Sequence, residues 1–445
     1  MTAEKTGVLQ RRSMIALISV LLLATFVFAG CSDSGDGKGA AEGGKVKLTW
    51  MVWGSTETVE KATESLFKAY PDMKDKVEIE GLVGGAGDPD VAKKLRLALA
   101  ANEDMPDIVM LNRTQLTEFA EAGILEDLTD VIKPVQGNLT QAAIELAGYK
   151  GKFVTIPYEI KTKIWFYRKD MFDAAGIDPT KVKNLDDFIA AGKKLREKFP
   201  DSSIWNLGKQ AAGYNLGMIV SGNGAKFTND QGDYIIATDP GVKKAFDMFK
   251  QLKDSGVTVE INDFTPDWEK GFANNTIASS LISNWFKNFL PKYAPDQAGK
   301  WAATEWPILA DADGGSEAGG SIFIIPTKGK HKKEAKDVLS KLLLTKQGAL
   351  ALNEIRSITP YLKDALQDPQ IQQPHKFFGA SLPLAESKAL EKVKVFSFSP
   401  AADLERSTMN EALSKYLNGA GSLDQILKQA ETDLKNQIGN PYKKK

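Results

Sequence analysis

The stretch KVKLTWMVWGSTETVEKATESLFKAY, residues 45–70, predicts a β-strand followed directly by an α-helix. Residues 45–52 are rich in apolar and aromatic residues, which are common in strands. From Glu57 to Tyr70 apolar residues recur at the spacing of one helix face, and Pro71 follows, where a helix does not readily continue. A strand joined to an amphipathic helix is the repeating unit of α/β proteins.

The same order of elements repeats directly downstream. Residues 76–83 (KVEIEGLV) predict a second strand, residues 90–101 (DVAKKLRLALAA) a helix, residues 107–111 (DIVML) a short buried strand, and residues 115–123 (QLTEFAEAG) a helix that ends at a glycine. Strands that alternate with helices in this way predict a mainly parallel sheet with helices on both faces.

The later part of the chain continues to mix strands and helices. Residues 151–176 form a long β-rich run that then enters a helix, and residues 185–293 have a mainly helical pattern. Residues 319–330 return to a strand, residues 332–355 predict a helix, and the last third of the chain is mainly helical. No internal repeat of fixed period is found in the sequence.

The only cysteine of the chain, Cys31, lies at the end of a hydrophobic segment. A basic segment comes first, an apolar run over residues 14–28 follows, and Ala29 and Gly30 stand directly before the cysteine. This run is shorter than the roughly 20 residues that span a bilayer. The stretch resembles a bacterial lipoprotein signal, which implies that residues 1–30 are removed and that Cys31 carries lipid. The alternative is an uncleaved membrane anchor.

Residues 31–44 contain five glycines together with Ser and Asp, which predicts a flexible tether. Two acyl chains hold a protein on a membrane stably, where one would not. We therefore expect a folded body that is lipid-anchored at the extracytoplasmic face of the cell membrane.

The composition is that of an ordinary globular protein. The full chain of 445 residues has a net charge of zero, 42% hydrophobic residues and 26% charged residues. Without residues 1–30 it is long enough for two or three domains with sizeable cores. A near-neutral chain offers no overall electrostatic attraction for nucleic acid, so we predict no nucleic-acid partner.

The order of the segments resembles the extracellular sugar-binding proteins of bacterial ABC importers, which are similar to maltose-binding protein. The segments that carry the resemblance are KLTWMVWGS, PDIVMLNRTQLTEFAEAGILEDLTD, GKFVTIPYEIKTKIWFYRKDMFDAAGID, GFANNTIASSLISNWF and GGSIFIIPTKGKHKKEAKDVLSKLL. Their order and spacing, over about residues 45–437, are more specific than any one of them.

The resemblance implies an α/β fold of two lobes, each with a mainly parallel sheet flanked by helices, that close on a ligand held between them. The connecting strands would cross near Tyr158–Lys161, Ser321–Ile325 and Ser357–Tyr361. The expected domains are an N-terminal lobe of residues 45–158 plus 322–357, a C-terminal lobe of residues 159–321 plus 358–437, and a basic tail of residues 438–445.

The resemblance also implies which residues hold the ligand. A sugar site needs aromatic platforms for the C–H faces of the rings and polar groups for the hydroxyls. The first loop would contribute Trp53 and Ser55, and the end of the strand at 107–111 would contribute Asn112 and Arg113, since ligands bind at strand carboxyl ends in open sheets. The expected aromatic platforms are Trp285, Tyr214 and Trp268, each with the alternative of a core position, whereas Trp165 is expected in the core.

Two positions depart from maltose-binding protein and raise a question about the charge of the ligand. Lys161 stands where an acidic residue is expected on the hinge strand, and Arg406 stands where a tryptophan is expected. Together with Arg113 these cations suggest an anionic carbohydrate, because Arg binds a planar carboxylate by bidentate hydrogen bonds. The alternative is that Lys161 and Lys163 are solvated surface residues and that the ligand is neutral.

No catalytic or metal-binding motif stands out. The chain has two histidines, and it contains no HExxH, G-x-S-x-G or Walker loop. We predict no cofactor, no metal and no enzymatic activity. Two alternatives stay open: a lipid-anchored glycoside hydrolase, since pairs of carboxylates can always be found, and a binding protein for a non-sugar solute such as a polyamine or a peptide. The expected partners are an oligosaccharide and the permease subunits of an ABC transporter, and the protein itself is expected to be a monomer.

Overall fold

The structure is a computed structural model that describes residues 44–443, apart from 209–212, 311–319 and 397. Residues Lys45–Lys445 form one compact unit. The predicted signal peptide (residues 1–30), the lipidation site Cys31 and nearly all of the tether lie outside the described residues.

The first lobe is built on a five-stranded sheet with the order β2-β1-β3-β12-β6. β1 runs parallel to β2 and β3, whereas β12 runs antiparallel to β3 and β6, so that four of the five strands share one direction. The predicted strand at 45–52 and helix at 57–70 are confirmed. The strands are β1 (Val46–Trp53), β2 (Val77–Gly85), β3 (Ile108–Asn112), β6 (Ile156–Ile160) and β12 (Gly320–Ile324).

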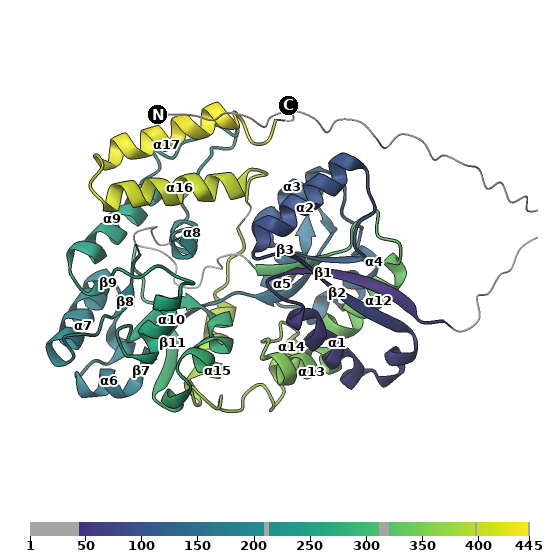
Figure 1. Cartoon of the computed structure of the whole chain (residues 1–445), viewed down its shortest axis with the longest axis horizontal. Coiled ribbons are helices and arrows are strands. Elements are labelled where there is room, and N and C mark those ends of the chain that lie inside the picture. The colour runs from purple at the N-terminus through teal and green to yellow at the C-terminus, as the bar shows by residue number, and fades with distance from the viewer. Residues whose placement is uncertain (1–43, 209–212, 311–319, 397, 444–445) are drawn as a thin grey trace, which may run out of the picture. The chain divides into compact units, whose positions relative to one another are not determined.

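Helices cover both faces of this sheet, as predicted. Successive residues of β3 alternate between two hydrophobic clusters, because side chains in a strand point to opposite faces with a period of two: Ile108 and Met110 pack with helix α1, and Val109 and Leu111 pack with helices α2 and α3. Figure 1 shows α2 and α3 on one side of the sheet and α1 and α13 on the other. The helices are α1 (Glu57–Ala69), α2 (Asp88–Ala101), α3 (Leu116–Glu121), α4 (Thr129–Ile132), α5 (Gln141–Ala147), α12 (Lys332–Leu343), α13 (Lys346–Arg356) and α14 (Lys363–Leu366), and a short hairpin joins β4 (Gly148–Tyr149) to β5 (Lys152–Phe153).

The second lobe contains a three-stranded sheet with the order β10-β7-β11, and both of its pairings are antiparallel. The prediction of a mainly parallel sheet is therefore wrong for this sheet. The physical reason is that β10 follows β7 after more than a hundred residues, and a connection of that length can return in either direction. The strands are β7 (Lys163–Arg168), β10 (Ser279–Ser283) and β11 (Trp301–Glu305), and β8 (Trp205–Asn206) pairs in parallel with β9 (Thr258–Val259).

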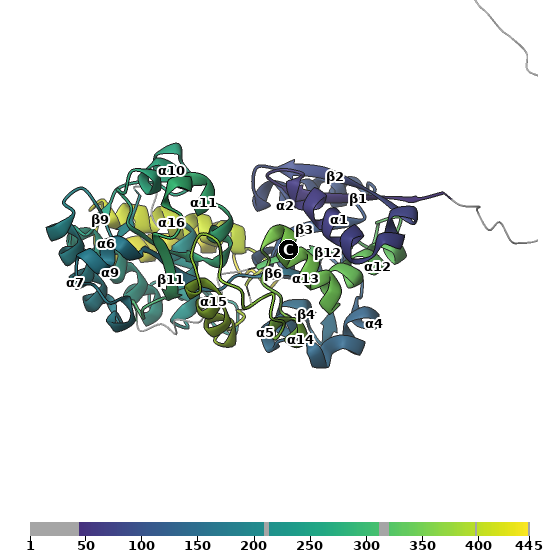
Figure 2. The ribbon, with the colours of Figure 1, turned by 90° about the horizontal axis from the view of Figure 1, so that it is seen from below.

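Nine helices of the described residues belong to the second lobe, and Figure 2 shows several of them around its sheet. Helices α16 and α17 pack against each other beside α9 (Figure 1), where Leu413 and Leu427 join one hydrophobic cluster. These helices are α6 (Lys169–Ala174), α7 (Leu185–Lys198), α8 (Gly213–Gly222), α9 (Pro240–Asp254), α10 (Pro266–Ala273), α11 (Leu290–Tyr293), α15 (Ser381–Glu391), α16 (Ala402–Leu417) and α17 (Leu423–Gln437).

The chain passes from one lobe to the other between β6 and β7, which are separated only by Lys161 and Thr162. It returns between β11 and β12, so the predicted crossing at Ser321–Ile325 falls on β12 itself, inside the first sheet. Ile358, Leu362 and Ala365 pack in the hydrophobic cluster of the first lobe, whereas the predicted division placed residues from 358 onward in the second lobe.

A buried ion pair of the second lobe lies next to the segment that follows α13. Lys287 donates from Nζ to Glu386 Oε1 at 2.6 Å and to Thr359 Oγ1 at 2.8 Å, and the two charged side chains are only 5% and 8% exposed. Thr359 belongs to the first-lobe segment after α13, whereas Lys287 and α15 belong to the second lobe. The hydrogen bond from Lys287 to Thr359 therefore joins this first-lobe segment to the second lobe.

His375 lies near this ion pair, and we expect it to make stability depend on pH. Burial, together with the charge of Lys287, lowers the pKa of His375 from 6.5 to about 4. Between these values the unfolded chain binds a proton that the native state does not, so the free energy of unfolding falls as the pH drops from 6.5 to 4. Because the ring is partly exposed, we expect a loss of about 1–2 kcal/mol.

Urea unfolding of the native sequence and of His375→Asn at pH 7 and pH 4.5 measures this loss. Asn supplies an acceptor for the amide of Phe377, which donates to His375 Nδ1 at 3.1 Å. The other histidine, His331, is present in both proteins, so a smaller pH dependence in the variant isolates His375. Equal pH dependence in the two proteins would contradict the expectation.

Candidate functional site

A large cleft lies between the two lobes and has a volume of about 1380 Å³. The first lobe contributes residues from the ends of β1, β3 and β6, and the second lobe contributes residues from η5 (Asn284–Asn288), from the loop before α10, and from α16. The cleft thus lies where the carboxyl ends of the parallel strands of the first sheet meet the second lobe.

The first-lobe wall contains three of the predicted residues. Trp53 ends β1 after an irregularity in its pairing with β2, and Ser55 follows a glycine at φ 78°, a backbone conformation that favours glycine. Asn112 ends β3, and its Oδ1 accepts hydrogen bonds from the amide and the hydroxyl of Thr114, both at 3.1 Å. All three residues line the cleft.

Arg113 does not line the cleft. It lies in η2 (Arg113–Gln115), directly after Asn112, and only 5% of it is exposed. The prediction that it holds the ligand is wrong for this structure, because the chain turns into η2 after β3 and carries the arginine into the interior.

An aromatic platform forms part of the second-lobe wall. We define it as Phe264, Trp285 and Phe289, which all line the cleft. The rings of Phe264 and Trp285 are stacked with centroids 5.8 Å apart and an angle of 23° between their planes, and Phe289 meets Trp285 edge-on at 5.4 Å. Trp285 lies at the cleft as predicted.

Phe264 was not predicted, although it is the most exposed ring of the platform, with 61% of the residue accessible. Its backbone has φ 60°, which is uncommon for a bulky residue and is found at functional positions. Thr265 then caps α10 by accepting from the amide of Trp268. The local sequence gives no signal for this role, because an apolar residue directly before a helix cap is typical of packing against the helix.

Trp268 lies four residues further on and does not reach the cleft. It is fully buried, its ring packs edge-on against Phe272 at 5.2 Å, and its Nε1 donates to Asn206 Oδ1 at 3.2 Å. Direct ligand contact by Trp268 is therefore contradicted, since it lies on the inner face of α10. Trp165 is fully buried in the core, as predicted. Tyr214 lies in α8, and its side chain is outside the described residues.

The two lysines after β6 are both buried, so the alternative of solvated surface residues is wrong. Lys161 lines the cleft, whereas Lys163 packs with its Nζ over the ring of Trp306, 5.2 Å from the centroid. Glu159 also lines the cleft and accepts a hydrogen bond from Ser321 Oγ at 3.2 Å. The hinge strand therefore does carry an acidic residue, two positions before Lys161, and the period of two along a strand could have identified it.

Positive and negative charges are balanced among the described residues of the cleft. The basic side chains that line it are Lys161, Lys226, Lys292, Arg356 and Arg406, and the acidic ones are Glu57, Asp88, Glu159, Asp230 and Glu405. Of these ten residues, only Lys161 and Arg406 were predicted from the sequence. The other charged residues were missed, since they come from segments far apart in the chain.

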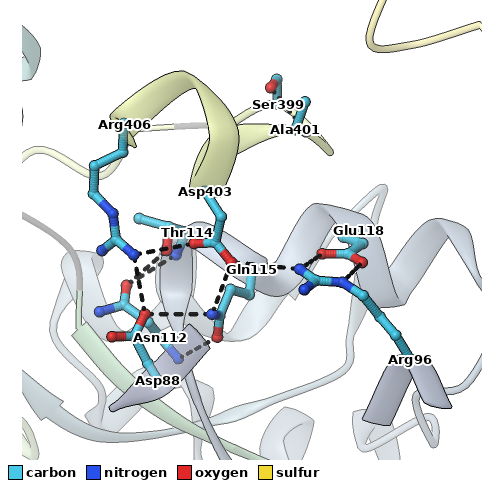
Figure 3. Close-up of polar contacts among 10 residues, drawn as sticks. All are labelled: Asp88, Arg96, Asn112, Thr114, Gln115, Glu118, Ser399, Ala401, Asp403 and Arg406. Carbon is cyan, nitrogen blue, oxygen red and sulfur yellow. Dashed lines mark hydrogen bonds and ion pairs between the residues drawn. The ribbon is translucent and has the colours of Figure 1, made fainter. Parts of the chain in front are cut away.

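Arg406 lines the cleft, as predicted, and meets a carboxylate of the opposite lobe. Its Nη2 lies 3.6 Å from Asp88 Oδ2 at the start of α2, and Figure 3 shows the two side chains facing each other. Burial raises the pKa of Asp88, and the positive charges of Arg406 and Lys161 oppose this shift. Burial also raises the pKa of Tyr158 to about 12, so its hydroxyl stays protonated in the cleft wall.

The described residues contain no group of three or more His, Cys, Asp or Glu side chains that could hold a metal ion. In the same part of the chain, no helix is both long enough and apolar enough to cross a membrane.

The chain has relatives in several bacteria. The chain is 27% identical to an arabinooligosaccharide-binding protein of Bacillus subtilis over 386 residues, which is 82% of this chain and 84% of the relative. It is 26% identical to a diacetylchitobiose binding protein of Streptomyces coelicolor over 80% of this chain and 83% of the relative.

Solved structures share the two-lobed α/β fold, which confirms the predicted fold class. An ABC transporter associated binding protein from B. animalis subsp. lactis, solved with β-1,6-galactobiose, matches with a TM-score of 0.74 and 21% identity over 90% of this chain and all of that chain. A maltose-bound protein of T. maritima matches with a TM-score of 0.72 and 19% identity over 88% of this chain and 99% of that chain. The family model for bacterial extracellular solute-binding proteins matches residues 65–379, well over half of the chain, and the chain therefore belongs to this family.

Proposed function

We propose that this protein binds an oligosaccharide between its two lobes and delivers it to the permease of an ABC transporter. The observation that carries the proposal is the aromatic platform of Phe264, Trp285 and Phe289, which shares one cleft with polar groups of the first lobe. Aromatic rings pack on the C–H faces of sugars, while amides, hydroxyls and charged groups bind their hydroxyls.

The size of the cleft supports an oligosaccharide over a single sugar. Pockets for drug-sized ligands occupy about 300–1,000 Å³, and this cleft, at about 1380 Å³, is larger. The three aromatic rings of the platform also line a wider part of the wall than one sugar ring covers. The relatives whose names mention arabinooligosaccharides and diacetylchitobiose agree with a ligand of this kind.

The balance of charges favours a neutral oligosaccharide over the anionic one that Lys161, Arg113 and Arg406 suggested. Arg113 is outside the cleft, and Arg406 already faces Asp88 at 3.6 Å. A ligand carboxylate would have to compete with these acidic groups, and it would be repelled by Glu159 in the same wall.

The proposed mechanism is closure of the lobes around the sugar. The lobe boundaries stay a prediction, and the packing of Ile358 and Ala365 supports extending the first lobe beyond residue 357. A ligand that touches both walls binds the closed arrangement more tightly, and it shifts the equilibrium by that difference in affinity. The permease would then recognise the closed form, and the protein would act as a monomer.

The proposal includes a lipid anchor on Cys31 and a location at the extracytoplasmic face of the membrane. The support is the sequence pattern of residues 1–30 and the membership of an extracellular protein family. Mass spectrometry of the mature N-terminus tests this part by itself, because a diacylated Cys31 has a characteristic added mass.

A thermal-shift screen with neutral oligosaccharides, uronate-containing oligosaccharides, amino acids and polyamines tests the binding function. A ligand that binds only the native state raises the melting temperature with the logarithm of its excess. We expect neutral oligosaccharides to raise the melting temperature and to be recovered uncleaved. Oligosaccharides that contain uronate should not raise the melting temperature further. Cleavage of the sugar would favour a glycoside hydrolase, and shifts only with polyamines or amino acids would favour a non-sugar solute.

A further inference from the structure

A cluster of polar side chains joins the two lobes beside the cleft. The first turn of α16 in the second lobe carries Asp403, which faces η2 and α2 of the first lobe (Figure 3). Asp403 Oδ2 accepts a hydrogen bond from Gln115 Nε2 at 3.2 Å and another from Arg96 Nη2 at 3.4 Å. A single carboxylate of the second lobe therefore binds two side chains of the first.

The same carboxylate also binds a residue of the ligand cleft. Asp403 Oδ1 accepts from Arg406 Nη2 at 3.2 Å, one turn further along α16. Arg406 lines the cleft and faces Asp88 across the lobes, and Gln115 Nε2 donates to Asp88 Oδ2 at 3.3 Å. Asp403, Arg96 and Gln115 do not line the cleft themselves.

The partners of Asp403 are themselves held in place. Arg96 donates to Glu118 Oε2 at 2.6 Å, which fixes its guanidinium on the first lobe. Gln115 is buried and accepts from the amide of Asn112 at 3.2 Å. Nearby, Thr117 Oγ1 donates to the carbonyl oxygen of Phe398, which adds another contact between the segment before α16 and the first lobe.

We propose that Asp403 is a positioning residue that couples the ligand site to lobe closure, a step that rests on the proposed function. One oxygen of Asp403 binds Arg406 on its own helix, and the other binds Arg96 and Gln115 of the first lobe. The contacts with the first lobe, including the one between Arg406 and Asp88, form only when the lobes are together. Asp403 therefore increases the closed fraction of the ligand-free protein and slows the release of the ligand without touching it.

The test uses three variants and two measurements. Asp403→Asn keeps the shape but removes the charge, and Arg96→Ala removes one first-lobe partner while leaving the Asp403–Arg406 contact. The matched control is Glu411→Ala on the same helix, which breaks the exposed Glu411–Lys415 ion pair within the second lobe. Circular dichroism melting shows that each variant is folded.

The first measurement is the distance between the lobes in the ligand-free protein. Spin labels are attached at Lys93→Cys on α2 and Lys428→Cys on α17, both exposed positions. The full chain carries Cys31→Ser and is purified in detergent, so that no other cysteine is labelled. The second measurement is the dissociation rate of a sugar found in the thermal-shift screen.

We expect Asp403→Asn to increase the fraction of ligand-free molecules with the longer distance between the two spin labels. It should also raise the dissociation rate of the sugar about 5- to 20-fold, the size expected for a few partly exposed charged contacts. Arg96→Ala should act in the same direction but more weakly, and Glu411→Ala should match the native sequence. Unchanged distances in Asp403→Asn would overturn the proposal, even if the dissociation rate rises, because the residue would then act through Arg406 alone. If no sugar binds, the proposed function fails, and the distances still decide whether Asp403 joins the lobes.

Discussion

Trp285→Ala is expected to weaken oligosaccharide binding about 30- to 300-fold, or about 2–3.4 kcal/mol, the cost typical of removing an aromatic residue at the centre of an interface. Trp285 lies in the middle of the aromatic platform, stacked on Phe264 and edge-on to Phe289. Removing the indole removes the face on which a sugar ring packs and also removes the ring that stacks on Phe264. Isothermal titration calorimetry with a sugar from the thermal-shift screen measures the loss.

The effect on binding can be separated from an effect on folding. Trp285→Phe keeps a ring at the same place, and we expect it to recover most of the affinity. Phe199→Ala removes a half-buried aromatic residue of the second lobe, at the end of α7 and outside the cleft, and should lower stability without changing affinity. If Trp285→Ala bound the sugar as well as the native sequence, the aromatic platform would not be the sugar site.

Lys287→Ala is expected to lower the free energy of unfolding by about 3–5 kcal/mol, because it leaves a buried charge without its partner. The side chain of Glu386 is 8% exposed, and its partner Lys287 also donates to Thr359 in the first-lobe segment after α13. Urea unfolding measures the change. The slope of the free energy of unfolding against urea concentration is taken as equal in the two proteins.

Two further variants identify the cause of this loss. Lys415→Ala breaks an exposed ion pair on α16 and should change stability by less than about 0.5 kcal/mol. The double variant Lys287→Met with Glu386→Leu removes both charges together, and we expect it to recover most of the stability lost in Lys287→Ala. If Lys287→Ala had the same midpoint urea concentration of unfolding as the native sequence, Glu386 would be solvated or paired in another way.

The sequence was informative wherever a property repeats over a short distance. The order of strands and helices over residues 45–123 was confirmed, because apolar spacing along a segment sets which face can be buried. The placement of Trp53, Ser55 and Asn112 at the cleft also agreed with prediction, since each follows a strand whose end lies at a known edge of the sheet.

The sequence was less informative about neighbouring residues whose side chains point in different directions. Phe264 and Trp268 are four residues apart, yet the first faces the cleft and the second is fully buried, because α10 begins between them. Asn112 and Arg113 are adjacent and separate in the same way at the start of η2. β10, with the sequence SSLIS, was missed as a strand because five fully buried residues give no alternation.

By itself, the sequence determined the α/β class, the resemblance to a family and a set of residues on strand ends, because these depend on local spacing and on the order of segments. Only the tertiary structure decided which charges meet in the cleft. Asp88, Gln115 and Asp403 are brought together from positions up to 315 residues apart. The tertiary structure also decided the antiparallel pairing of the second sheet and the buried Lys287–Glu386 pair. The physical reason is that long-range contacts follow from how the two lobes pack, and no local pattern in the chain records that packing.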